Sequence, residues 1–129
     1  MKFIRNTQGA AAVEFGLLAL PVIGLILAII EFGWVLWIDN ALNIATDTAA
    51  RCGAVQSTTT PCNGTDMVTT ANTIFPVTSP AATFTNNTAC QNDGGSGLVG
   101  TYNASIGVWV WSVSVTLTAT SCYPTVSAS

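Results

Sequence analysis

The sequence contains no histidine, and only nine of its 129 residues are charged, three basic and six acidic. Without histidine the chain lacks the usual general base and the commonest metal ligand. No basic residue follows Arg51, so the sequence offers no basic surface for nucleic acid. We therefore expect no enzyme activity, cofactor, metal site, small-molecule substrate or nucleic-acid partner. A carboxylate pair, Asp66 with Asp93, is the remaining catalytic alternative.

A long apolar run dominates the N-terminal third. The 24 residues from Phe15 to Ile38 carry one charge, Glu31, and would span about 36 Å as a helix, enough for a hydrocarbon core of about 30 Å. This run is too long for the core of an ordinary secretory signal, and no A-x-A site follows it. Two basic residues precede it, which places the N-terminus in the cytoplasm and the bulk of the chain outside. Trp34 and Trp37 fit the outer membrane interface.

The residues just before the apolar run resemble a type IV prepilin signal. Gly9 is followed by four residues and then by Glu14 and Phe15, at the start of the apolar helix. The resemblance implies that a prepilin peptidase cuts between Gly9 and Ala10. It also implies that Glu14 pairs with the new amine of Ala10 on a neighbouring subunit, so that each charge offsets the other's desolvation. The alternative is that Glu14 only flanks a membrane anchor at the level of the headgroups.

The helix is expected to bend at Pro21 and to continue beyond the membrane. Proline removes one backbone hydrogen bond, although membrane helices tolerate it. After the membrane, apolar or small residues recur every three or four positions while polar residues take the opposite face. Asp47 and Arg51 are spaced to form a surface ion pair, and Gly53 is a natural helix end. The expected packing stripe is Ile38, Leu42, Ala45, Ala49 and Cys52.

Four cysteines lie beyond the apolar run, and none forms a C-x-x-C motif: Cys52, Cys62, Cys90 and Cys122. An even number in a small exported domain indicates two disulfide bonds. Four cysteines allow three pairings, so the sequence does not determine the connectivity. The sequential pairing closes the shortest loops and is the one we favour.

The segment from 56 to 100 is rich in Thr, Ser, Asn, Gly and Pro, which predicts loops and short elements, with one helix over residues 67–75. Residues 106–120 are rich in β-branched and aromatic residues and alternate in their second half, which predicts a strand. Residues 98–104 would pair with it through a turn near 103–107, and this hairpin would pack on the alanine-rich helix. Trp109 and Trp111 would share one strand face, where core packing is favoured over contact with a sugar or partner subunit.

The stretch QGAAAVEFGLLALPVIGLILAIIEFGWVLW, residues 8–37, resembles the TadE-like pseudopilins of tight-adherence (Flp) pilus systems. These share a G-A-x-x-V-E-F start, a proline within the apolar run and a second E-F-G. Residues 49–54 and the chain near Tyr123 and Pro124 are also similar. The resemblance implies a minor pilin that takes part in assembly or tip structure of an adhesive pilus. Its partners would be the membrane, a prepilin peptidase, other pilin and pseudopilin subunits and an inner-membrane assembly platform.

The expected organisation is a pilin-like α+β chain with three parts. Residues 1–9 form the leader, residues 10–54 a transmembrane and amphipathic helix, and residues 55–129 a loop-rich, disulfide-tied antiparallel β domain. The chain would sit in a bacterial inner membrane with this domain in the periplasm, and later in the pilus or at the cell surface. The alternative function is a single-pass surface module in which Trp109 and Trp111 recognise a carbohydrate or partner.

Overall fold

The computed structural model describes residues 8–55, 62–108 and 111–125. Contacts divide the chain into two compact units, residues 1–34 and residues 35–129. A single helix, α1 (Gln8–Ala54), contributes residues to both units. By length and composition α1 can cross a membrane, and its most apolar stretch is not buried within the chain. Pro21 lies inside this helix, and a bend there stays a prediction.

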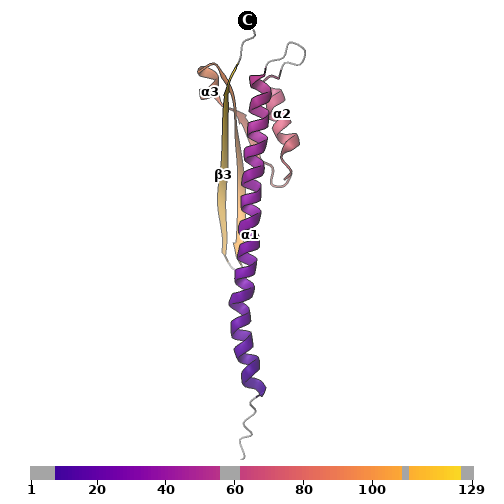
Figure 1. Ribbon diagram of the computed structural model, residues 1–129, viewed down its shortest axis with the longest axis vertical. Helices are drawn as coiled ribbons and strands as arrows, with labels where there is room; N and C mark the ends of the chain where they lie inside the picture. The colour runs from indigo at the N-terminus through magenta and orange to yellow at the C-terminus, as the bar shows by residue number, and fades with distance from the viewer. Residues whose placement is uncertain (1–7, 56–61, 109–110, 126–129) are drawn as a thin grey trace, which may run out of the picture. The chain divides into compact units, whose positions relative to one another are not determined.

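Unit 2 contains the rest of the secondary structure and is a small α+β fold, as predicted. Its further elements are α2 (Gly64–Ile74), β1 (Thr83–Asn86), α3 (Thr88–Asn92), β2 (Gly95–Val108) and β3 (Trp111–Pro124). The three strands form one antiparallel sheet in the order β1-β2-β3. Within this unit the β2–β3 hairpin runs along the C-terminal part of α1 (Figure 1).

Helix α2 confirms the short helix expected over residues 67–75 and begins three residues earlier because of its cap. The Asn63 side chain accepts hydrogen bonds from the backbone N–H groups of Thr65 and Asp66 at 2.9 and 3.0 Å. The Asp66 carboxylate accepts in return from the Asn63 N–H at 3.1 Å. This reciprocal arrangement satisfies N–H groups that the first helical turn leaves free. Met67 and Ala71 are buried, so the face of α2 that carries them packs in the core.

The predicted stripe on α1 forms one wall of the core of unit 2. Ile38, Leu42, Ala45 and Ala49 are all buried, and Cys52 is partly buried. They pack with the inner face of the sheet, chiefly Leu98, Tyr102, Ala104 and Ala119. The helix and sheet approach closely at Gly100, where an added Cβ would lie 2.8 Å from Thr46 Cγ2 and 3.1 Å from Leu42 Cδ1. Small residues on both surfaces therefore set the spacing between helix and sheet.

The hairpin differs from the sequence-based prediction in the position of its turn. Strand β2 continues through residues 103–107, where a turn was expected, and the chain reverses between Val108 and Trp111, which pair with each other. Asn103 instead faces Thr116 across the strands, and its side-chain oxygen accepts a 2.8 Å hydrogen bond from the Thr116 hydroxyl. Gly107 and Asn103 belong to residue types that are common in turns. Both are exposed on the outer face of β2, where such residues destabilise the strand little. The alternating sequence pattern continues through the chain reversal, so the pattern does not show where the reversal lies.

Two disulfide bonds are present, as predicted, and the pairing is the sequential one. Cys52 near the end of α1 is joined to Cys62 before α2, and Cys90 in α3 is joined to Cys122 in β3. The first bond ties the helix to the segment that follows it. The second ties the polar α3 segment to the end of the sheet. Both constrain parts of the chain that have few apolar side chains to bury.

Candidate functional site

The expected processing and pairing residues lie at the start of α1. Gly9 and Ala10 are the second and third residues of the helix. Gly9 is exposed, with no atom within 4 Å of the position that a Cβ would take. Glu14 is exposed, and the Phe15 ring is 75% exposed. Gly9, Glu14 and Phe15 are therefore exposed on one helical segment, where other molecules can reach them.

The helix of unit 1 is apolar around its whole circumference. Its large apolar side chains are between 42% and 75% exposed, and they occupy positions on every side of the helix. A helix that is hydrophobic all round needs an apolar surrounding, either lipid or other subunits. The residues are Val13, Phe15, Leu17, Leu18, Leu20, Val22, Ile23, Leu25, Ile26, Leu27, Ile29, Ile30, Phe32 and Trp34.

Glu31 is the second carboxylate on the helix of unit 1, after Glu14. Its Oε2 atom is buried and has no hydrogen-bond partner among the residues that the structure describes. An unpaired buried polar atom costs about 1–3 kcal/mol, and a charged one more. A donor from another molecule would remove this cost, so Glu31 joins Glu14 as a position where the apolar helix could accept a polar partner.

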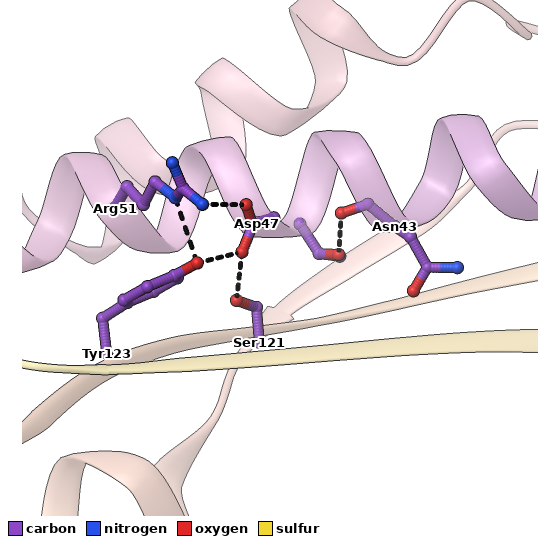
Figure 2. Close-up of polar contacts among 6 residues, drawn as sticks. Asn43, Asp47, Arg51, Ser121 and Tyr123 are labelled. Carbon is purple, nitrogen blue, oxygen red and sulfur yellow. Dashed lines mark hydrogen bonds and ion pairs between the residues drawn. The ribbon is translucent and has the colours of Figure 1, made fainter.

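In unit 2, four polar side chains connect α1 to the end of β3 (Figure 2). Asp47 and Arg51 form the predicted ion pair, with 3.1 Å between Oδ2 and Nη2. The Tyr123 hydroxyl donates to Asp47 Oδ1 and accepts from Arg51 Nε at 3.0 Å. The Ser121 hydroxyl donates to the same carboxylate oxygen at 3.3 Å. The Arg51 guanidinium also lies 5.3 Å from the centre of the Tyr123 ring, within cation–π range.

This cluster shifts the titration of both charged groups toward their charged forms. The hydrogen bond from Tyr123, followed by the charge of Arg51 and the hydrogen bond from Ser121, lowers the pKa of Asp47 from its ordinary value, although desolvation opposes the shift. The same tyrosine and the charge of Asp47 raise the pKa of Arg51. The cluster therefore fastens the helix to the last strand as a charged group of contacts.

The sequence predicted the Asp47–Arg51 pair but missed its two partners on β3. Residue spacing within a helix reveals an i, i+4 pair directly. Tyr123 lies 76 residues from Asp47, and its position opposite the helix depends on the register of the hairpin. The only sequence signal was the resemblance of the chain near Tyr123 and Pro124 to the TadE-like pattern.

Trp111 does not pack in the core, so the favoured expectation for it is wrong. Its side chain is 80% exposed, because the hairpin extends beyond the part of the sheet that the core covers. Trp111 and the buried Ala119 are an even number of residues apart, so they lie on the same face of β3. Trp109 lies outside the described residues.

The remaining candidates give no catalytic arrangement among the described residues. Asp66 belongs to the α2 cap, and Asp93 is the C-terminal cap residue of α3. No group of three or more His, Cys, Asp or Glu side chains in the described chain could hold a metal ion. An open depression of about 300 Å³ has only uncharged lining residues: Gly53, Cys62, Asn63, Gly64, Met67, Gln91, Gly94, Gly95, Ser96 and Thr125.

The comparison with models of protein families finds a match that lies on α1. Residues 9–51, about a third of the chain, match the family model described as TadE-like protein. Neither the curated proteins nor the solved structures gave a match. The matched segment begins at Gly9, includes Glu14, Phe15 and Glu31, and ends at Arg51 in the polar cluster. Helix α1 therefore contains a segment similar to TadE-like proteins, as the sequence resemblance predicted.

Proposed function

We propose that this protein is a minor pilin, or pseudopilin, that takes part in the assembly or tip structure of a tight-adherence pilus used for surface attachment. The TadE-like match associates the chain with such pilus systems. The observation that carries the finer proposal is the placement of Gly9, Glu14 and Phe15. They lie exposed at the start of a helix that is apolar on all sides and is not buried within the chain.

The proposed processing explains why a carboxylate stands at the start of an apolar helix. A prepilin peptidase removes residues 1–9, and Ala10 then carries a free amine. Among subunits packed through their apolar helices, this amine and Glu14 of a neighbour form an ion pair in a medium of low polarity. The pair is favourable there because each charge would otherwise be buried alone. Before assembly, the same helix anchors the protein in the inner membrane.

The proposal assigns a role to each part of the chain. Residues 1–9 are the leader, residues 10–54 the membrane and packing helix, and residues 55–129 the exported domain. The N-terminus faces the cytoplasm and the domain faces the periplasm until the subunit enters the pilus. The partners are the peptidase, other pilin and pseudopilin subunits and the assembly platform. Both disulfide bonds suit an oxidising compartment.

A charge-neutral variant of Glu14 tests the pairing. We expect Glu14→Gln to leave the protein in the membrane but to lower its amount in the sheared pilus fraction at least tenfold, because the buried amine loses its counter-charge. The matched control is Asp39→Asn, which neutralises a carboxylate on the same helix beyond the apolar run. Quantitative immunoblots of membrane and pilus fractions provide the measurement. Equal amounts of the Glu14 variant and the parent protein in the pilus fraction would argue against the pairing.

The alternative function, a membrane-anchored module that binds a carbohydrate or partner, depends on Trp111. This side chain is exposed, but it lines neither the depression near Gly53 nor a second depression beside α2. Sugar recognition needs a shaped site with polar groups around an aromatic platform. We therefore favour the assembly function.

A further inference from the structure

Glu31 places a carboxyl group deep in the apolar part of α1. Its Oε2 atom is buried and has no hydrogen-bond partner within the described parts of the chain. No side chain from Phe15 to Ile30 carries a hydrogen-bonding group. Glu31 comes roughly 24 Å after Phe15 along a helix, so it lies within a hydrocarbon core of about 30 Å that begins at Phe15. A carboxyl group at such a depth is costly, and it usually pairs with another polar group.

Small residues lie on the same side of the helix as Glu31. Gly24 and Ala28 precede it along the chain. At about 100° per residue, the three positions fall within roughly 60° of one another around the helix. Nothing lies within 4 Å of the position that a Cβ would take at Gly24. We call Gly24, Ala28 and Glu31 together the Glu31 face.

The Glu31 face has the two properties that allow membrane helices to pair. Small residues four positions apart let two backbones approach closely, and a polar side chain beside them can then form a hydrogen bond between the helices. The opposite side of the helix carries the exposed branched side chains of Val22, Ile26 and Ile29. These hold a neighbouring helix at a greater distance, and none of them offers a hydrogen bond.

A second copy of the same helix can supply the partner that Glu31 lacks. Copies that cross the membrane in the same direction hold Glu31 at the same depth. A two-fold axis between two parallel helices brings each residue of the contact close to its own counterpart. A carboxyl group that holds its proton has both an O–H donor and an acceptor oxygen. Two such groups therefore satisfy each other without a third residue.

We propose that two copies of this protein pair in the membrane as parallel helices through the Glu31 face, with the two Glu31 carboxyl groups hydrogen-bonded to each other. The inference depends on the membrane span of α1 and requires neither leader cleavage nor entry into a pilus. It is a different contact from the proposed pairing of Glu14, which needs the amine that cleavage creates. Its failure would therefore leave the proposed pilus function standing.

Self-association of the full, uncleaved chain in lipid vesicles tests the proposal. Förster transfer between copies labelled with donor or acceptor at the N-terminal amine, measured as lipid is added, gives the dissociation constant of the pair. We expect Glu31→Leu to raise this constant at least threefold, the effect of losing one hydrogen bond between membrane helices. Glu31→Gln should stay close to the parent protein, because an amide also has a donor and an acceptor.

Two further pairs of variants test which face is used. Gly24→Ile should weaken the pair, whereas Gly33→Ile, on the other side of the helix, should not. Neither substitution meets an atom of its own chain within 4 Å of the Cβ position. All four native cysteines are in disulfide bonds, so a new thiol reports its own contacts. On oxidation in vesicles, Ala28→Cys should form a covalent dimer and Ile26→Cys should not.

Four results would overturn the proposal. The first is the absence of energy transfer above the level of random encounters at every ratio of protein to lipid. The second is an unchanged dissociation constant for Glu31→Leu, which would show that the carboxyl group reaches water or headgroups instead. The third is equal covalent dimer formation by Ala28→Cys and Ile26→Cys. The fourth is crosslinking of Ala28→Cys in native membranes to a different protein in place of a second copy.

Discussion

At the scale of single residues, Asp47 links the helix to the sheet through contacts that depend on its charge. Its pKa is lowered chiefly by the hydrogen bond from Tyr123, and also by the charge of Arg51. A carboxyl group whose pKa is lower in the folded state stabilises that state above the pKa of the unfolded chain, near 3.8. This contribution is lost as the pH falls through the folded pKa, when the carboxylate takes up a proton.

We therefore expect Asp47→Asn to flatten the acid limb of the stability profile of unit 2. The parent protein should lose stability as the pH falls below about 4, and the variant should lose less over the same range while being less stable at pH 7. Tyr123→Phe should have a similar effect because it removes the main cause of the shift. Denaturant unfolding from pH 2 to pH 7, followed by near-ultraviolet circular dichroism in detergent, provides the measurement. An equally steep profile for Asp47→Asn would contradict this role.

The polar cluster also shows what sequence reasoning could and could not predict about individual residues. Asp47 and Arg51 are one helical turn apart, so their pairing could be predicted from helix geometry alone. The contacts of Ser121 and Tyr123 depend on the position of the chain reversal in the hairpin. That reversal lies after Val108, not at 103–107 where the composition placed it. An error of a few residues in the turn was enough to hide both contacts.

At the scale of secondary structure, the close contact between α1 and β2 depends on the absence of a side chain at Gly53. A Cβ there would lie 2.1 Å from Ser96 Oγ and 2.3 Å from Met67 Sδ. Ser96 is itself buried, and its hydroxyl donates a 3.0 Å hydrogen bond to that sulfur. The end of α1, the start of β2 and the first turn of α2 therefore meet at this residue.

We expect Gly53→Ala to destabilise unit 2 by about 1–3 kcal/mol, because the added methyl group must displace Ser96 or Met67. Helix propensity alone would predict the opposite, a gain of about 1 kcal/mol. Gly33→Ala on the same helix is the matched control, since nothing lies within 4 Å of its Cβ position. Chemical denaturation of unit 2 distinguishes the two effects. An increase in stability for Gly53→Ala would show that the contact at Ser96 does not exist.

Periodicity predicted the elements that have a regular core face and missed those that do not. The stripe from Ile38 to Ala49 repeats with helical spacing and is buried as predicted. The alternation over residues 112–118 likewise predicted that one face of β3 packs on the helix. Strand β1 is only four residues long, with one buried side chain, Phe84. So short a strand has no readable pattern, and its pairing with β2 depends on the tertiary fold.

At the scale of the whole molecule, the two units have different kinds of surface. Unit 1 exposes an apolar helix that needs lipid or other subunits around it. Unit 2 has its own core, two disulfide bonds and an uncharged sheet. This difference was predicted from the sequence. The apolar run and the TadE-like pattern indicated the exposed helix, and the number of cysteines indicated the disulfide bonds. The arrangement of residues 76–93 could not be predicted, because polar loop-forming residues there fold around the Asn87 cap and the Cys90–Cys122 disulfide bond.

Removal of the leader is the most direct test of whether the N-terminal segment is a prepilin signal. Intact-mass measurement of the protein extracted from membranes of cells that contain a prepilin peptidase should show the loss of Met1 to Gly9, with Ala10 as the new N-terminus. A Gly9→Leu variant should keep its full length, because it removes the glycine of the prepilin pattern. If the parent protein retains residues 1–9 while a known prepilin in the same cells is cleaved, the segment is not a prepilin signal.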